Sequence, residues 1–324
     1  MTSARPHRTP KSMFWNSSKD VVQTADAVEG SFVYRQAPKA WRPYLKLARL
    51  DRPVGAWLLL WPCWWSLMLA ADDGFALTHV YLLALFAIGA LAMRGAGCTY
   101  NDIVDRDFDG AVERTKSRPI PAGEVSLKGA WVFLIFQCFI GLAVLLQLGE
   151  FAIMVGLGSL VMVAIYPFMK RITGWPQAWL GLTFNWGALM GWATLKGELS
   201  AAPLVLYFGA LFWTLGYDTI YAHQDKEDDA LIGVKSTALT LGEKTKPALV
   251  IFYSLFIIGL VGAGILAKLG FFYYIGIAFA GLHLAAQVRR TNTDDAAICL
   301  EVFRSNIAFG WIVFIALILG QLVQ

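Results

Sequence analysis

Charged residues are scarce in this chain. Asp, Glu, Lys and Arg make up 15% of its 324 residues, whereas hydrophobic residues make up 57% and the mean hydropathy is +0.55. A protein with so little polar surface cannot enclose an ordinary core in water, which argues against a water-soluble globular protein. We therefore expect the lipid bilayer to be its solvent.

Patterned cysteine and histidine are also missing from the sequence. The four cysteines have no CxxC spacing and no neighbouring histidine, and all lie in or beside apolar segments. This arrangement argues against a disulfide framework and against a zinc site. The cysteines are Cys63, Cys98, Cys138 and Cys299.

Long apolar runs, by contrast, follow one another almost without pause from Val54 to Val323. A membrane-spanning helix needs about 20 mostly apolar residues, and lipid offers the backbone no hydrogen-bond partner. Because the runs are also too long and too uniformly apolar for barrel strands, the sequence predicts an all-α membrane protein with nine transmembrane helices. The expected spans are 54–71, 77–97, 129–148, 151–169, 176–195, 202–221, 247–267, 270–288 and 303–323.

Lys and Arg lie on one side of the predicted bundle. If the N-terminus is cytoplasmic, the outer connections contain only Lys196 and Lys268, whereas each inner connection carries several basic residues. The positive-inside rule therefore predicts a cytoplasmic N-terminus and a C-terminus on the other side. Tryptophans gather near several predicted helix ends, where we expect most of them to be interface anchors: Trp57, Trp61, Trp64, Trp65, Trp175, Trp179 and Trp311.

We expect two parts, an N-terminal cytoplasmic tail over residues 1–44 and a helical domain over 45–324. Residues 1–19 contain four basic residues and no acidic one, but they lack the apolar run of a secretory signal peptide. No clear amphipathic arginine helix emerges either. We therefore expect a flexible tail in a bacterial inner-membrane protein, and the alternative is a cleaved presequence that directs the protein to the mitochondrial inner membrane.

Acidic residues gather at the inner end of the second predicted helix. In the run from Asn101 to Asp109, the side chains of Asn101, Asp105 and Asp109 are four residues apart and share one helix face. Carboxylates are costly to place beside a membrane, so this stripe indicates function. Asp107 falls off the shared face and is expected to be solvated.

A second acidic stripe follows the sixth predicted helix, where Asp218, Tyr221, Asp225 and Asp229 recur at helical spacing. If the bundle has two related halves, the two stripes face each other across one cavity. The alternative is that these acids are only solvated residues at helix ends. That interpretation suits an isolated Asp, but two helically spaced stripes favour function.

Oxygen ligands without histidine or cysteine suit magnesium, which completes its shell with water and substrate phosphate. The stripes therefore predict a Mg²⁺ site that binds a diphosphate. Nearby basic residues could bind phosphate or a substrate carboxylate, or they could only fix the topology. A position inside an apolar helix favours function for Arg94, and the two roles stay open for Arg114, Arg118, Arg171 and Lys235.

Six longer patterns carry a family resemblance. They are Leu50-Asp-Arg-Pro-x-Gly55, Leu60-Trp-Pro62, Asn101-Asp-x-x-Asp-x-x-x-Asp109, Arg114-Thr-x-x-Arg-Pro119, Tyr166-Pro-Phe-Met-Lys-Arg171, and Tyr217-Asp-Thr-x-Tyr-Ala-x-x-Asp-Lys-x-Asp-Asp229 with Gly233-Val-Lys-Ser-Thr237. Together they resemble the UbiA superfamily of intramembrane prenyltransferases over about residues 45–315, and most closely its 4-hydroxybenzoate polyprenyltransferase branch. The first acidic motif indicates only the superfamily, whereas the last pattern is more specific.

The resemblance implies a nine-helix bundle around a central cavity that opens sideways to lipid. It also implies that Asp105, Asp109, Asp225 and Asp229 bind two magnesium ions, and that Arg171 assists substrate binding or ionisation. The implied substrates are a polyprenyl diphosphate and 4-hydroxybenzoate, joined ortho to the hydroxyl in a step of ubiquinone biosynthesis. Membrane lipid is the expected surrounding, and no nucleic acid partner is expected.

In the mechanism we expect, metal and basic residues neutralise the leaving diphosphate, the allylic C–O bond ionises, and the acceptor ring attacks. The acceptor carboxylate could pair with Arg94 or Arg52, and Asp218 is the candidate base. Asn101, with the first stripe, is expected to bind metal and substrate. Tyr221 and Lys235 are expected to bind substrate.

Two other functions stay open on the sequence. One is a prenyltransferase for another aromatic acceptor, such as homogentisate. The other is a cation-coupled transporter, because intramembrane acids also line ion pathways. Against the transporter, the acids lie at inner helix ends rather than at the membrane midplane, and no interrupted helix is evident from the sequence.

Overall fold

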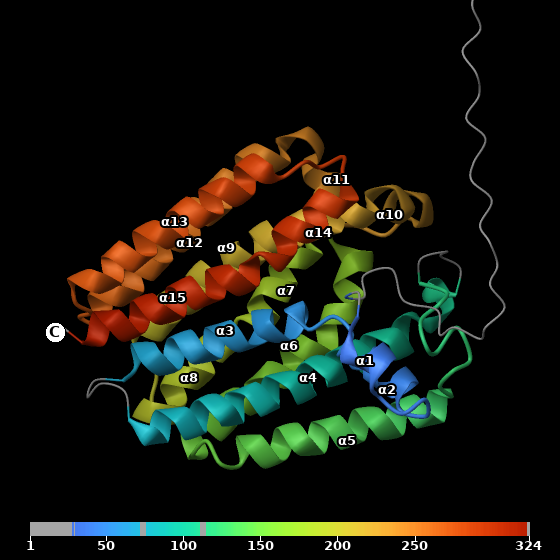
Figure 1. The fold of residues 1–324 in the computed structure, drawn as a ribbon, viewed down its shortest axis with the longest axis horizontal. Coiled ribbons are helices and arrows are strands. Elements are labelled where there is room, and N and C mark those ends of the chain that lie inside the picture. The colour runs from blue at the N-terminus through green and yellow to red at the C-terminus, as the bar shows by residue number, and fades with distance from the viewer. Residues whose placement is uncertain (1–27, 29, 72–75, 111–114, 323–324) are drawn as a thin grey trace, which may run out of the picture.

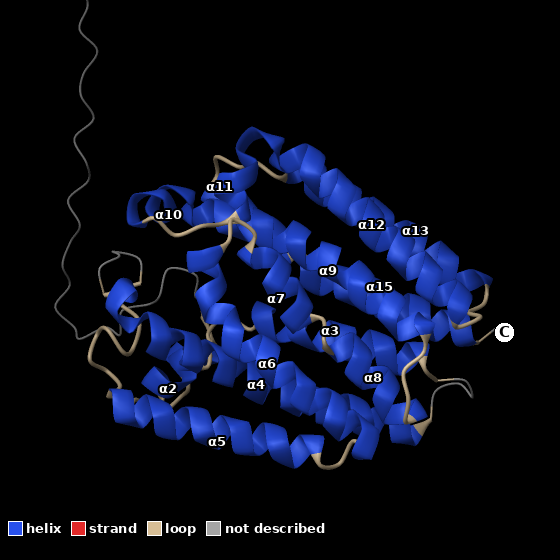
Figure 2. Ribbon diagram, turned by 180° about the vertical axis from the view of Figure 1, so that it is seen from behind, coloured by secondary structure: helices blue, strands red, loops and turns tan. Residues whose placement is uncertain are grey.

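The structure is a computed structural model that describes residues 28, 30–71, 76–110 and 115–322. Within these ranges the chain forms helices joined by turns, and no strand occurs, which confirms the predicted all-α class (Figures 1 and 2). The elements are α1 (Phe32–Arg35), α2 (Arg42–Leu47), α3 (Val54–Leu69), α4 (Leu77–Asp109), α5 (Leu127–Leu145), α6 (Glu150–Ile172), α7 (Pro176–Phe184), α8 (Gly187–Lys196), α9 (Ala201–Ala222), η1 (His223–Asp225), α10 (Lys226–Ile232), α11 (Thr237–Leu241), η2 (Gly242–Lys244), α12 (Thr245–Leu266), α13 (Phe271–Arg290), α14 (Ala296–Arg304) and α15 (Asn306–Gln321).

Several helices are long and apolar enough to cross a membrane. Six such segments occur in the described part of the chain: Leu77–Asp109, Leu127–Leu145, Glu150–Ile172, Thr237–Leu266, Phe271–Arg290 and Ala296–Gln321. α3 is apolar but shorter. A membrane protein is therefore confirmed, whereas the count of nine spans and the side of the N-terminus stay predictions.

Glycines bring two central helices into close contact. A Cβ atom on Gly209 of α9 would lie 3.1 Å from the Cα of Gly259 on α12, so a larger side chain at either position would push the helices apart. Small residues allow this close backbone approach, which is a common way to pack helices in a membrane. α9 is thereby held in the core, where it also packs against α7 and α14.

One predicted helix is interrupted. The span expected at 176–195 divides into α7 and α8 at Asn185 and Trp186, so the prediction of a continuous helix is wrong. The fully buried Asn185 amide donates hydrogen bonds to Gly181 O (2.8 Å), Ala210 O (3.0 Å) and Thr214 Oγ1 (2.7 Å). Two of these hydrogen bonds reach α9, so groups of the neighbouring helix stabilise the break.

Part of the tryptophan prediction is also wrong. Trp61 and Trp65 have no exposed surface. Trp61 packs against Trp311 of α15 with ring centroids 5.0 Å apart, and Trp65 Nε1 donates to the Gly310 carbonyl at 3.1 Å. These two rings therefore hold α3 against α15 instead of lying at the membrane surface.

The described residues before position 45 contact the bundle. Val33 of α1 is buried, and the Tyr34 hydroxyl donates to Asp51 at 3.1 Å. Lys46 of α2 is fully buried and pairs with Glu124 at 2.8 Å. α2 thus packs against α4 and α1 against α2, while most of the expected flexible tail lies outside the described residues. The boundary at residue 44 stays a prediction.

Candidate active site

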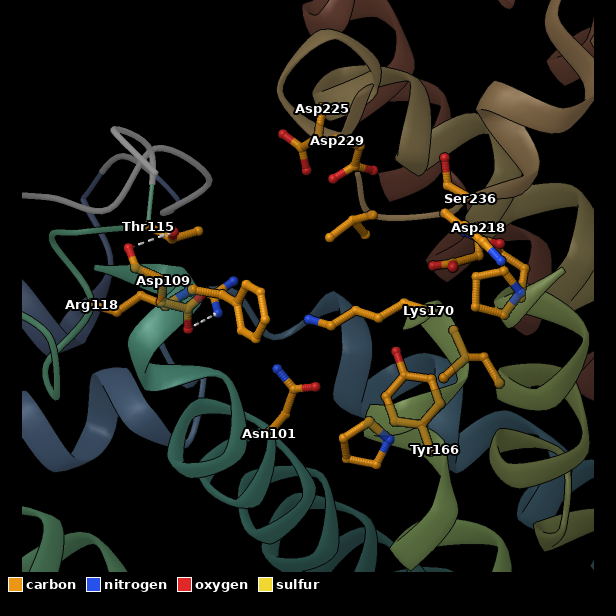
Figure 3. A pocket seen from close by; sticks show the side chains of 17 residues that line it. Asn101, Asp109, Thr115, Arg118, Tyr166, Lys170, Asp218, Asp225, Asp229 and Ser236 are labelled. Carbon is orange, nitrogen blue, oxygen red and sulfur yellow. Dashed lines mark hydrogen bonds and ion pairs between the residues drawn. The ribbon is translucent and has the colours of Figure 1, made fainter. Parts of the chain in front are cut away.

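Both acidic motifs line one cavity of about 230 Å³ at the end of the bundle, between α4, α6, α7, α9 and α10. Figure 3 shows Asn101 and Asp109 on one side, Asp225 and Asp229 on the other, and Lys170 extending between them. The residues that line it are Asn101, Phe108, Asp109, Thr115, Arg118, Tyr166, Pro167, Lys170, Pro176, Gln177, Leu180, Asp218, Asp225, Asp229, Val234, Lys235 and Ser236. The predicted juxtaposition of the two motifs is therefore observed.

The first motif lies on one uninterrupted helix. α4 continues for 33 residues and ends at Asp109, which places Asn101 and Asp109 on the same face, as their spacing predicts. The Arg118 guanidinium holds this end in place, since its Nη1 lies 2.6 Å from Asp109 Oδ2. The Thr115 hydroxyl also donates to the Asp109 carbonyl at 2.9 Å. Asp107 is 80% exposed, as expected.

Asp102 and Arg49 are two residues that the sequence reasoning missed. Asp102 is fully buried, and its Oδ1 accepts from Arg49 at 2.6 Å and from Arg118 at 3.2 Å. Arg118 therefore links two carboxylates of the first motif. The signal was present in the sequence, because Asp102 belongs to the acidic run and Arg49 to the basic segment before the first long helix.

Asp105 lies between Asn101 and Asp109 on α4, but it is not among the residues that line the cavity. Its side chain is fully buried and forms ion pairs with Lys170 and with Arg171, whose Nη2 lies 3.0 Å from Asp105 Oδ1. The Arg171 guanidinium also stacks 4.7 Å from the centre of the Phe108 ring. Lys170, the neighbour of Arg171, is the residue of this basic pair that lines the cavity.

The second motif changes direction where a continuous helix was expected. α9 ends at Ala222, η1 makes one tight turn, and α10 begins at Lys226, so the single helical stripe from Asp218 to Asp229 is wrong. Even so, Asp218, Asp225 and Asp229 all line the cavity. Tyr221 does not, because its ring packs against Phe303 with the centroids 4.5 Å apart.

The turn at η1 depends on His223. Its ring is buried, and its Nε2 shares a hydrogen bond with Thr245 Oγ1 at 3.0 Å. Burial, assisted by the positive charge of Lys226, lowers the pKa of His223 below its ordinary value. The ring is therefore neutral near pH 7 and acts here as a packing and hydrogen-bonding group.

The remaining predicted residues have varied positions. Arg94 lies against Gly55 of α3 and over the Phe184 ring (5.3 Å), outside the cavity lining, and its buried Nε has no hydrogen-bond partner. Arg52 pairs with Asp51 at 3.3 Å and also lies outside the lining.

Lys235 is among the residues that line the cavity, although its Nζ donates to Ile172 O at 3.2 Å. Arg114 lies outside the described residues.

The donor chemistry of the cavity fits magnesium. Within the described ranges no three His, Cys, Asp or Glu side chains lie close enough to hold a metal by themselves. The cavity does present the carboxylates of Asp109, Asp225 and Asp229 and the amide of Asn101, with no histidine or cysteine among its lining residues. Magnesium commonly binds through a few such oxygens together with water and substrate phosphate, so a diphosphate would supply what the protein does not.

The profile of the UbiA prenyltransferase family matches residues 59–318. The chain belongs to this family. It is 50% identical over 299 residues to the mitochondrial 4-hydroxybenzoate polyprenyltransferase of Rattus norvegicus, covering 91% of this chain and 79% of that one. The protein of the same name from Arabidopsis thaliana is 47% identical over 310 residues, covering 94% and 76%.

Solved structures show the same fold. The apo UbiA homolog from Aeropyrum pernix K1 has a TM-score of 0.68 at 24% identity and covers 81% of this chain and 96% of that one. The UbiA homolog from Archaeoglobus fulgidus bound to GPP and Mg²⁺ has a TM-score of 0.58 at 21% identity and covers 84% and 99%. These structures share the fold, whereas the family match over residues 59–318 and the relatives about 50% identical confirm the predicted resemblance to the family.

Proposed function

We propose that this protein transfers a polyprenyl group from a polyprenyl diphosphate to 4-hydroxybenzoate, at the ring carbon ortho to the hydroxyl. Family membership gives the reaction class, and relatives about 50% identical carry the name of this enzyme. The observation that carries the proposal is the single cavity where two acidic motifs face each other around Lys170. With magnesium held by the carboxylates, such a cavity would suit a substrate whose head group is strongly anionic.

Diphosphate binding is the role we propose for the cavity. Asn101, Asp109, Asp225 and Asp229 would hold magnesium, and Asp105 stays a predicted ligand. When bound, the metal would offset the negative charge of the diphosphate. Lys170 and Arg118 place fixed positive charge on the cavity wall, which stabilises the charge that develops on the leaving group as the allylic bond breaks.

The acceptor is proposed to lie deeper, between α4 and α9. The Arg94 guanidinium, with its buried unpartnered Nε, would pair with the carboxylate of 4-hydroxybenzoate. Asp218 lines the cavity on α9 and is the proposed base that takes the ring proton after the new C–C bond forms. Apolar wall residues such as Phe108, Pro167 and Leu180 exclude water that would quench the prenyl cation.

Membership of the family removes the transporter alternative, and the names of the relatives favour 4-hydroxybenzoate over homogentisate. Those names also describe mitochondrial proteins. They favour the mitochondrial inner membrane, which was the alternative, over the bacterial inner membrane as the location of this chain.

Purified protein supplied with Mg²⁺, a polyprenyl diphosphate and a mixture of aromatic acids tests the proposal. We expect the prenylated product of 4-hydroxybenzoate to dominate over that of homogentisate. Asp225→Asn should lower kcat/KM by about 100-fold or more, since removal of a metal-binding oxygen costs at least this order, whereas the exposed Asp107→Asn should retain activity. A preference for homogentisate would overturn the acceptor, and full activity of Asp225→Asn would overturn the metal assignment.

A further inference from the structure

The described side chains of α10 include few that pack against the bundle. The helix is seven residues long, its Leu231 is 84% exposed, and it packs mainly against η1 and α11 rather than against a long helix. Helices this short are not stable in isolation. Figure 1 shows α10 beyond the end of the long helices, beside α11 and α14. Yet α10 and the residue before it carry Asp229 and Asp225, whose positions the proposed reaction requires.

Two attachments hold α10 at its ends. At its first residue, Lys226 Nζ donates to the Thr293 carbonyl at 3.0 Å and to Asp294 Oδ1 at 2.7 Å. Beyond its last residue, Lys235 N and Nζ bind carbonyls at the end of α6, including Ile172 O at 3.2 Å. The first residue of α10 is therefore attached to the turn 291–295, and the segment after its last residue is attached to α6.

The turn that receives Lys226 is itself well fixed. The Thr291 hydroxyl donates to Gln287 O at 2.8 Å, and the Cys299 thiol lies 3.2 Å from Asn292 O. Asp295 Oδ1 caps α14 by accepting from the backbone amides of Ala297 and Ile298 at 2.9 and 3.0 Å. A supporting group on a rigid element can hold a site residue precisely, and Asp294 lies within this rigid turn.

We propose that Asp294, acting through Lys226, is a positioning residue that keeps Asp225 and Asp229 directed into the cavity. This inference rests on the proposed function, because it assumes that those two carboxylates bind the metal. The Lys226 ammonium also holds the pKa of Asp294 below its ordinary value, as a close ion pair requires. Since Asp294 is 80% exposed, such a pair contributes little to global stability, and its effect is on the local position of α10.

Mn²⁺ binding tests this inference without turnover. It is measured by electron paramagnetic resonance on the purified protein in the presence of inorganic diphosphate. Asp294→Asn should raise the Kd for Mn²⁺, and the Mg²⁺ concentration for half-maximal activity, on the order of 5-fold, which is less than the loss of a group bonded directly to a ligand. Asp294→Glu should keep near-normal values. The thermal midpoint and kcat at saturating Mg²⁺ should change little.

Two comparisons separate positioning from the bare charge of Asp294. In a Lys226→Met background, Asp294→Asn should have no further effect, whereas a long-range charge effect would persist there. Glu301→Gln breaks the exposed Arg290 ion pair beside the same turn and should leave Mn²⁺ binding unchanged. Unchanged Mn²⁺ binding in Asp294→Asn, or an equal effect of that change in the Lys226→Met background, would overturn the inference. Failure of the parent protein to prenylate 4-hydroxybenzoate would count only against the proposed function.

Discussion

Asp105 is the residue whose environment differs most from its expected role. It belongs to the first acidic motif, yet Lys170 and Arg171 surround its buried carboxylate, and the cavity wall is formed by Asn101 and Asp109 instead. Removing one partner of a buried ion pair leaves the other charges uncompensated. Asp105 therefore contributes to the stability of the fold, in addition to its predicted metal-binding role.

Asp105→Asn should therefore lower the free energy of unfolding as well as activity. We expect a loss of about 1 to 2 kcal/mol, below the 3 to 5 kcal/mol of a fully buried pair, because Lys170 and Arg171 are about one-third exposed. Thermal unfolding of the purified protein without metal measures it, with Asp107→Asn as the exposed control on the same helix. An unchanged midpoint, with activity lost, would assign Asp105 to metal binding alone.

The two acidic motifs show how far sequence periodicity predicts a site. Asn101 and Asp109 share a face as their spacing predicts, because α4 continues unbroken past both residues. The spacing of Asp218 and Asp229 suggested the same geometry, but α9 stops at Ala222, where His223 binds Thr245 across the next turn. That hydrogen bond joins residues 22 positions apart, so no local sequence pattern predicts it.

At the scale of helices, apolar length predicted where the long apolar helices lie but not where one of them breaks. The sequence around Asn185 has no proline, and Asn185 and Gly187 are weak signals, because Asn and Gly also occur inside the continuous helix α4. The break is stabilised by groups on α9, since the Asn185 amide reaches Ala210 O and Thr214 Oγ1. Such a feature becomes visible only when α7 and α9 are placed together.

Asn185→Ala should destabilise the bundle because it removes three hydrogen bonds of the buried side-chain amide, two of which reach α9. We expect a loss of about 1 to 3 kcal/mol, since a hydrogen bond contributes roughly 0.5 to 1.5 kcal/mol to stability. Thermal unfolding in detergent measures it. Gln147→Ala is a suitable control, because it removes an exposed hydrogen bond to Tyr81 and should change the midpoint little. Equal midpoints for the two variants would show that the break is held by packing alone.

For the whole molecule, the one-sided distribution of Lys and Arg predicts which end of the bundle faces the cytoplasm or, in a mitochondrion, the matrix. The cavity opens at the end where α4 and α9 finish, and that end carries Arg118, Lys170 and Arg171. A diphosphate head group would therefore enter from the positively charged side. The orientation thus decides which compartment supplies the anionic substrates.

Accessibility of introduced cysteines to a membrane-impermeant maleimide tests this orientation. Glu198 precedes α9 and Glu243 follows it, and both lie in exposed connections. Because α9 has 22 residues and rises about 33 Å, the two positions should lie on opposite sides of the membrane. In a background with the exposed Cys138 replaced by serine, Glu243→Cys should label from the side of the N-terminus and Glu198→Cys only from the other. Labelling of both from one side would contradict the predicted topology, and the reverse pattern would place the cavity mouth on the opposite face.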